Sequence, residues 1–256
     1  MSRKSLAMAV AALSMLSADS RRSFATTATG LGSFGGIEEP SAVFHADGTV
    51  TQGDSYTNIT DKGGGTIRMT LRYYQGNWSD GDRNTTSTTM QRAEVKVLGA
   101  RQLQGETYTY SSQWRTSSGY TFATTNTCAV QQVKATDGDN NQGLSATFLS
   151  SQTSGRTAHG AGSGMTTVRT FSWSAGTYMT VANKIKISSS AGRADGLYQT
   201  SINGDSFRGI TNVVMERPGS TTYQPKWGLY RSQGNLNIAR GTGEYVEHTK
   251  VTSTKN

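Results

Sequence analysis

The chain has 256 residues, of which 34 % are hydrophobic and 30 are glycine. This length suits one large all-β domain or two small ones. After the N-terminal region no long segment repeats apolar residues every 3.6 positions, and the absence of this helical period excludes a mainly helical protein. The formal charge of +8 at pH 7 favours an anionic partner: nucleic acid, an acidic polysaccharide or an anionic membrane surface. The single cysteine, Cys128, excludes an intrachain disulfide, and its apolar surroundings predict a buried thiol.

Residues 1–25 are predicted to be a cleaved leader. Two basic residues precede the apolar run 6–16, which has the length of a signal-peptide core and is too short to cross a bilayer. We therefore expect a secreted protein. The sequence Arg-Arg-Ser-Phe-Ala at 21–25 resembles the end of a mitochondrial presequence, so organelle targeting is the alternative. Removing the leader takes away four basic residues and one acidic residue, so the remainder stays basic.

Residues 26–42 are rich in Gly, Thr and Ser and are predicted to be a flexible linker before a single domain at 43–256. Strand-like runs recur along that domain, at 66–74, 90–98, 107–115, 127–135, 166–173, 178–187, 196–202, 210–216, 222–231 and 244–251. Turn signals between them include Gly63-Gly64-Gly65, Asp137-Gly138, Ser154-Gly155, Gly192 and Asn203-Gly204. Many short strands without interleaved helices predict an all-β fold, a jelly-roll sandwich of two antiparallel sheets with a concave substrate groove.

The strand at 90–98 has one small apolar face and one charged face. Because side chains alternate along a strand, its inward residues are expected to be Ala93, Val95 and Val97, and its outward residues Arg92, Glu94 and Lys96. A charged face of this kind suits a groove that holds an anionic polymer.

Two later strands carry further polar groups. In 127–135, Gln132 and Lys134 share a face; in 222–231, Lys226, Gly228 and Tyr230 share one. Gly228 is expected to leave an open patch where a ligand approaches the backbone.

These three segments resemble the strand motifs of jelly-roll polysaccharide lyases. The motifs are Arg-x-Glu-x-Lys at 92–96, Gln-Val-Lys at 132–134 and Tyr-x-x-Lys-x-Gly-x-Tyr at 223–230. Alginate lyases of polysaccharide lyase family 7 carry the similar patterns Arg-x-Glu-x-Arg, Gln-Ile/Val-His and Tyr-Phe-Lys-Ala-Gly-x-Tyr. The order and spacing also suit the glucuronan lyases of family 20.

The resemblance implies β-elimination in an acidic polyuronide, without a required cofactor. Arg92, Gln132 and Lys134 would neutralise the uronate carboxylate, and Tyr230 would act as base and then as acid. The implied substrate-binding residues are Glu94, Lys96, Lys226 and Tyr223. Among them, Glu94 would orient Arg92 or Lys96, and Lys96 and Lys226, with Arg92, would favour the phenolate form of Tyr230.

Lys134 stands where family 7 has histidine, the expected base for guluronate. In D-glucuronate and D-mannuronate the C5 proton and the C4 oxygen lie on the same side of the ring, so one tyrosine can serve both steps. We therefore expect syn elimination, with β-1,4-glucuronan as substrate and mannuronate (alginate) as the alternative. Lys134 as a desolvated base is the second mechanism.

Other interpretations of the same residues remain. The charged strand faces suit a non-catalytic carbohydrate-binding jelly roll, or are simply solvated. Nucleic acid is disfavoured as a partner, because the basic residues fall on separated strands rather than in a basic tail or helix. We expect a monomer that binds neither nucleic acid nor membrane. An acidic turn, Asp137, Asp139, Asn140 and Asn141, offers oxygen ligands for a structural Ca²⁺, although it lacks EF-hand spacing.

Overall fold

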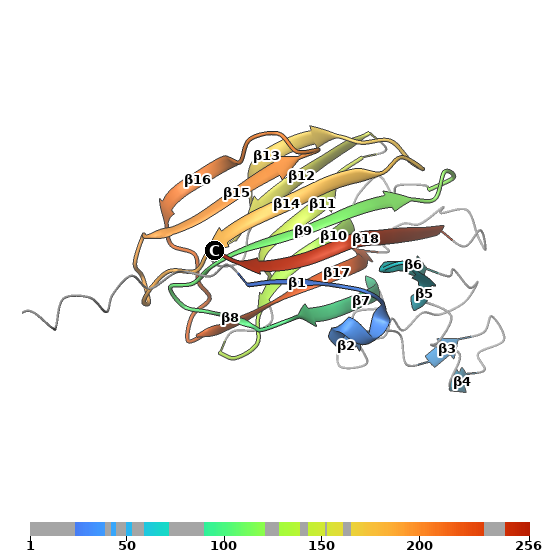
Figure 1. Cartoon of the computed structure of the whole chain (residues 1–256), viewed down its shortest axis with the longest axis horizontal. Helices are drawn as coiled ribbons and strands as arrows, with labels where there is room; N and C mark the ends of the chain where they lie inside the picture. Colours follow the sequence, from blue (N-terminus) through green and yellow to red (C-terminus); the bar gives the residue numbers. More distant parts are fainter. Residues whose placement is uncertain are drawn as a thin grey trace, which may run out of the picture.

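The computed structural model describes residues 24–38, 42–44, 50–52, 59–71, 90–120, 128–138, 143–151, 153–160, 165–232 and 244–256. These residues form two antiparallel sheets of eight strands each, stacked as two layers, and a separate two-stranded ribbon (Figure 1). The predicted all-β jelly-roll sandwich is confirmed. Within the described ranges, no helix is long and apolar enough to cross a membrane.

We call the first layer sheet A. Its strands run in the order β16 (Arg208–Val213), β15 (Gly196–Ile202), β14 (Met179–Lys186), β9 (Thr107–Thr116), β18 (Glu244–Lys255), β6 (Thr66–Leu71) and β5 (Ile59–Gly63). The short strand β1 (Phe24–Thr27) also pairs with β18. In Figure 1 this layer lies in front, with β14, β9 and β18 crossing the view.

The second layer is sheet B. Its strands run in the order β13 (Thr166–Ser172), β12 (Ser154–His159), β11 (Gly143–Leu149), β10 (Cys128–Ala135), β17 (Thr222–Ser232), β7 (Met90–Leu98) and β2 (Phe34–Glu38). Strand β8 (Gln102–Leu103) pairs with the other end of β17. The remaining elements are the 3₁₀ turn η1 (Leu31–Ser33) and the ribbon of β3 (Ala42–Phe44) and β4 (Val50–Gln52).

Period-two alternation builds the core between the layers. Along β9 every second side chain is buried: Tyr110 and Trp114 point inward, whereas Thr109, Ser111 and Gln113 point out. The ring of Tyr110 meets that of Trp227 from β17 edge-on, with centroids 6.2 Å apart. Cys128 is buried, as predicted.

A buried polar network also links the layers. The Asn183 amide nitrogen of β14 donates to Gln131 Oε1 (2.9 Å) and Thr147 Oγ1 (3.0 Å) of sheet B. Its amide oxygen accepts from the hydroxyls of Tyr198 and Thr200 in sheet A. Buried polar groups that are satisfied in this way fix the relative position of the strands that carry them.

The predicted linker is wrong over the residues that the structure describes. Strand β1 pairs with β18, and β2 pairs with β7, so residues 24–38 contribute to both sheets. The high glycine content of this segment is the reason that β2 was not predicted, although Gly36 pairs with Lys96 in the sheet. The last two residues of the predicted leader, Phe24 and Ala25, belong to β1. Residues 1–23 lie outside the described ranges.

Two smaller expectations are also wrong. Ser154-Gly155 is not a turn but the start of β12, where a Cβ on Gly155 would overlap the ring of Phe171. Val97 does not continue the apolar face of β7. Its φ is +60°, which interrupts the alternation, and Leu98 takes the buried position instead.

Candidate active site on the outer face of sheet B

The three sequence motifs come together on adjacent strands, β7, β17 and β10. Lys226 lies opposite Lys96 on one side and Gln132 on the other, and Tyr230 lies opposite Arg92. The alternate residues of these strands, including Ala93, Val95, Trp227 and Leu229, fill the core. The outer face of sheet B, which is turned away from sheet A, is therefore shared by six motif residues: Glu94, Lys96, Gln132, Lys134, Lys226 and Tyr230.

A β-bulge decides which way Gln132 points. Between Ala129 and Gln131 the register of β10 shifts against both of its neighbours, and Val130 and Gln131 are both buried. Gln131 is held inward by Asn183 and by the carbonyl of Tyr110. The alternation restarts after it, so Gln132 and Lys134 face outward and Val133 faces the core.

Gln132 is joined directly to the charged strand. Its amide nitrogen donates to Glu94 Oε1 across 2.6 Å, and the two side chains are 8 % and 1 % exposed. Gln132 is thus a partner of Glu94 that the sequence did not predict, and the role of Glu94 in orienting Arg92 or Lys96 stays a prediction. A short, buried, charge-assisted hydrogen bond of this kind restricts the amide to one orientation.

The charge around this pair is mainly positive. Lys226 is only 3 % exposed, Lys96 and Lys134 are partly exposed, and Glu94 is the acidic member of the motifs. The Arg92 backbone is placed by its pairing with Tyr230; its side chain lies outside the described set. Tyr230 is partly exposed.

Tyr223 is corrected from substrate-binding residue to core residue. Its side chain is fully buried, its hydroxyl donates to Ser220 O (3.2 Å), and it accepts from Arg217 N (3.0 Å). Strand alternation places Tyr223 on the opposite face from Lys226 and Tyr230, so its position in the core could have been predicted from the sequence.

Gly228 is not an open patch. A Cβ there would lie 2.7 Å from Glu94 Cα and closer still to the Ala93 carbonyl, so this glycine lets β7 and β17 approach each other. From the core side, His248 of β18 reaches the same residue: its Nε2 lies 3.4 Å from Gly228 O, and its Nδ1 lies 3.3 Å from Ser112 Oγ. Burial lowers the pKa of His248 to about 4 and the hydrogen bond to Gly228 opposes this, so the ring is neutral at neutral pH.

The described residues offer no metal centre. They contain no group of three or more His, Cys, Asp or Glu side chains that could hold an ion. Asp137, from the predicted Ca²⁺ turn, instead accepts hydrogen bonds from Thr221 Oγ1 (2.7 Å) and Thr222 N (3.0 Å). The side-chain bond from Thr221 is the main cause that lowers the Asp137 pKa. Residues 139–141 lie outside the described ranges.

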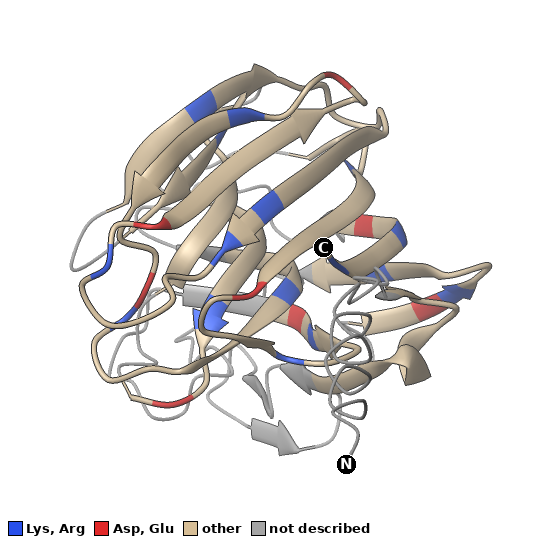
Figure 2. Cartoon of the chain, turned by 60° about the vertical axis from the view of Figure 1, so that its left-hand side comes forward, with Lys and Arg blue, Asp and Glu red and all other residues tan. Residues whose placement is uncertain are grey.

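Two outward residues of sheet B were not predicted. Phe148 of β11 and Arg156 of β12 lie in the row that starts at Tyr230. Neither β11 nor β12 was expected from the sequence, so strand alternation could not place these two side chains. Elsewhere, basic residues are spread over many strands of both layers (Figure 2).

Comparison with solved structures identifies the fold. No protein-family model matches the chain, and no curated protein matches it in sequence. An endo-β-1,4-glucuronan lyase from the fungus Trichoderma reesei aligns with a TM-score of 0.59 at 16 % identity, covering 91 % of this chain and 94 % of that one. The chain has the fold of that lyase.

Two alginate lyases of polysaccharide lyase family 7 give similar alignments. Alginate lyase A1-II′ aligns with a TM-score of 0.55 at 15 % identity, covering 86 % of this chain and 93 % of its own. Alginate lyase AlgAT5 aligns with a TM-score of 0.52 at 14 % identity, with the same coverage. At these identities the likeness establishes the architecture, and the chemistry rests on the residues of the candidate site.

Proposed function

We propose that the chain is a polysaccharide lyase that cleaves an acidic polyuronide, β-1,4-glucuronan, by syn β-elimination. The observation that carries the proposal is the convergence of the three motifs on one face of adjacent strands, with Tyr230 in register with Arg92 and Gln132 in register with Lys226. The glucuronan lyase from Trichoderma reesei supports the choice of polymer through its shared fold.

The first task of such a site is to neutralise the uronate carboxylate, because a negative charge beside C5 opposes removal of the C5 proton. Gln132 uses one amide N–H for Glu94 and has a second for the substrate. Arg92 is the second donor that we assign to the carboxylate. Lys96 and Lys226 add positive charge around the enolate that forms, which stabilises the transition state.

The second task is proton transfer at Tyr230. As phenolate it takes the proton from C5, the electron pair forms the C4–C5 double bond, and the C4–O bond breaks. The tyrosine hydroxyl then returns that proton to the leaving oxygen, so the residue ends in its starting state. A single group suffices because the C5 proton and the C4 oxygen of glucuronate lie on the same side. Mannuronate shares this geometry and is the alternative substrate. Lys134 is assigned to carboxylate binding, and its action as base is the alternative mechanism.

The cellular setting follows from the same proposal. Secretion would bring such an enzyme to its polymer, and it agrees with a leader in the N-terminal region that ends before β1. We propose a secreted monomer with an acidic polysaccharide as partner and no required cofactor.

The test is an assay on pure polyuronides. Ultraviolet absorbance of the unsaturated uronate should rise with glucuronan, less with polymannuronate, and not with polyguluronate. Tyr230→Phe should abolish this rise yet still bind the polymer, whereas Tyr178→Phe, on the outer face of sheet A, should leave it unchanged. Turnover by Tyr230→Phe would remove that residue from the mechanism. Polymer binding by the wild type without unsaturated product would identify a carbohydrate-binding domain instead.

A further inference from the structure

A row of outward positions extends from Tyr230 across sheet B. Tyr230 of β17 lies opposite Ala129 of β10, Ala129 opposite Phe148 of β11, and Phe148 opposite Arg156 of β12. Neighbouring strands are about 4.8 Å apart, so three steps place the Arg156 backbone about 14 Å from that of Tyr230. The row runs perpendicular to the strands and begins at the proposed catalytic residue.

The side chains of Phe148 and Arg156 point away from the core. Their neighbours in the chain, Thr147 and Thr157, are fully buried and bond across the sandwich, to Asn183 and Thr200 respectively. Alternation therefore turns Phe148 and Arg156 to the outer face, where both are partly exposed.

The Arg156 guanidinium is held in place by neutral groups. It lies over the Phe148 ring, 5.1 Å from the centroid, and Nη1 donates to Thr167 Oγ1 at 3.0 Å. That hydrogen bond uses one of its five N–H donors.

Four other arginines in the described ranges pair with carboxylates: Arg68 and Arg115 with Glu247, Arg169 with Asp205, and Arg193 with Asp195. No carboxylate in the described part of the chain forms an ion pair with Arg156. Its position is fixed, and its charge is available to an anion.

We propose that Arg156 forms a distal subsite that binds the carboxylate of a uronate residue in the chain being cleaved, with Phe148 as its support. This inference rests on the proposed function. The spacing between strands is close to the length of one sugar in an extended polyuronide. A chain that follows the row from Tyr230 brings a carboxylate to Arg156 about three residues from the cleaved bond. The planar fork of arginine suits bidentate binding of that group.

The test separates long substrates from short ones. Arg156→Gln should raise KM for polymeric glucuronan about fivefold, the size of one partly exposed charge-assisted contact, with kcat unchanged. KM for a trisaccharide, which is too short to reach the subsite, should not change. Arg156→Lys keeps the charge but loses the fork, so its KM should lie between those of the wild type and Arg156→Gln.

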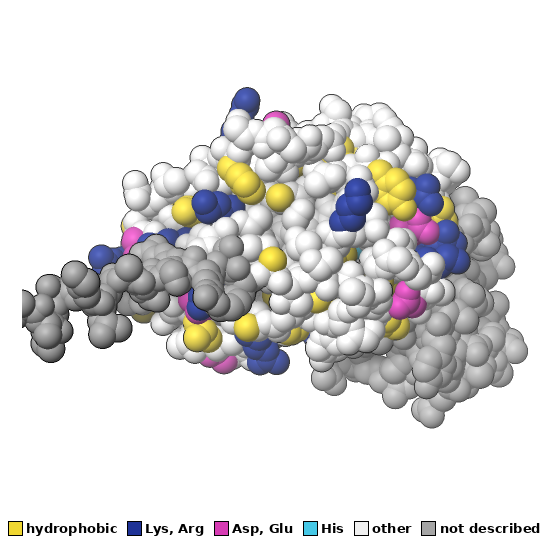
Figure 3. Space-filling model, viewed as in Figure 1, with side chains coloured by type: hydrophobic (Ala, Val, Ile, Leu, Met, Phe, Trp, Pro, Cys, Tyr) yellow, Lys and Arg dark blue, Asp and Glu magenta, His cyan; other side chains and the backbone are white. Residues whose placement is uncertain are grey.

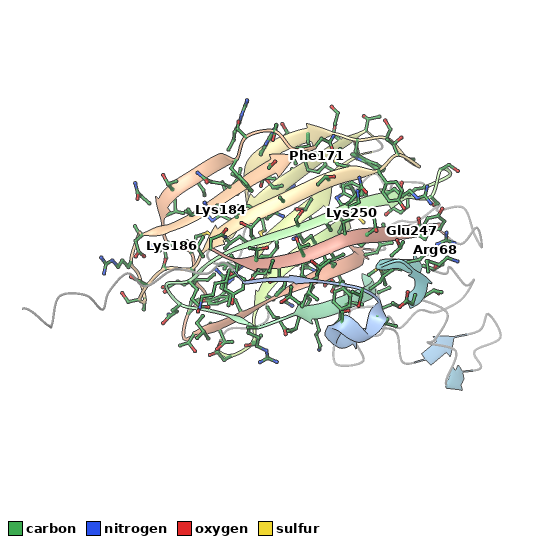
Figure 4. The ribbon with its side chains drawn as sticks, in the orientation of Figure 1. Arg68, Phe171, Lys184, Lys186, Glu247 and Lys250 are labelled. Atoms are coloured by element: carbon green, nitrogen blue, oxygen red, sulfur yellow. The ribbon has the colours of Figure 1, made fainter. Side chains whose placement is uncertain are left out.

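Lys184→Gln provides the matched control, because it removes one positive charge from β14 on the outer face of sheet A (Figure 4). On that face charged side chains are scattered among uncharged ones (Figure 3). Lys184→Gln should leave KM for the polymer unchanged. An unchanged polymer KM in Arg156→Gln, or an equal rise for the trisaccharide, would overturn the subsite.

A binding measurement distinguishes failure of the subsite from failure of the proposed function. Retardation in a native gel that contains glucuronan should be weaker for Arg156→Gln than for Lys184→Gln, both made in the Tyr230→Phe background. If the wild type forms no unsaturated product, the lyase proposal fails, and weaker retardation of Arg156→Gln alone still supports the subsite. Equal retardation of the two variants would refute it.

Discussion

His248 makes the stability of the sandwich depend on pH. The ring is fully buried beneath the candidate site, and its folded-state pKa of about 4 lies well below its ordinary value of 6.5. In the unfolded chain the ring takes up a proton near pH 6.5, whereas the folded protein resists protonation until about pH 4. The stabilisation from neutral His248 is therefore complete above pH 6.5 and is lost as the pH falls toward 4.

The size of the effect follows from the shift. At about 1.4 kcal/mol per pKa unit, the full loss is about 3 kcal/mol, and about 2 kcal/mol of it is lost between pH 7.5 and pH 5. Asp195 and Asp205, with pKa values of about 2, titrate below this window. The other histidine among the described residues is His159, whose pKa is also lowered by burial.

Urea unfolding at the two pH values measures this difference. The glutamine of His248→Gln is uncharged at both pH values and still carries hydrogen-bonding groups. Between pH 7.5 and pH 5 the free energy of unfolding of this variant should therefore fall by about 2 kcal/mol less than that of the wild type. His159→Gln, the matched control, should remove a smaller part of the pH dependence. If His248→Gln loses as much stability as the wild type between pH 7.5 and pH 5, the assignment of the pH dependence to His248 is wrong.

Three further predictions concern the strands around the site. Gly228→Ala should lower the free energy of unfolding by about 3 kcal/mol, because the added Cβ would force β7 and β17 apart. The control is Gly32→Ala, where a Cβ has open space and should cost little. Equal unfolding midpoints of the two variants in urea would contradict the close approach of the strands at Gly228. Glu94→Gln should reduce kcat/KM on glucuronan about tenfold, because the hydrogen bond that orients Gln132 would no longer have a charged acceptor. An unchanged kcat/KM in steady-state kinetics would contradict the role assigned to Glu94. Asn183→Leu should destabilise the protein by about 3 kcal/mol, because it leaves Gln131 and other buried partners unsatisfied, and an unchanged urea midpoint would argue against that network.

Strand alternation was enough to group the residues of each motif. Glu94 with Lys96, and Lys226 with Tyr230, share a face in the structure because a regular strand has a period of two. Each of the ten strands expected from the sequence overlaps a strand among the described residues. The same rule, applied to Tyr223, would have placed it in the core.

Local irregularities interrupt this alternation at two places that no sequence pattern marks. Val97 adopts a positive φ, and the bulge at Val130–Gln131 reverses the alternation just before Gln132. Counting from Cys128 and Val130 would have turned Gln132 inward. The contacts of Gln131 with Asn183 and Tyr110 hold Gln131 inward, and Gln132 then faces outward, where it donates to Glu94.

By itself the sequence determined the fold class and the members of each motif, since both follow from the short-range pattern of apolar and polar side chains. The tertiary structure decided which strands are neighbours: β17 between β10 and β7, β1 beside the C-terminal strand, and Arg156 in the row of Tyr230. Those pairings join residues far apart in the chain, and they are selected by how both sheets pack together rather than by any local preference.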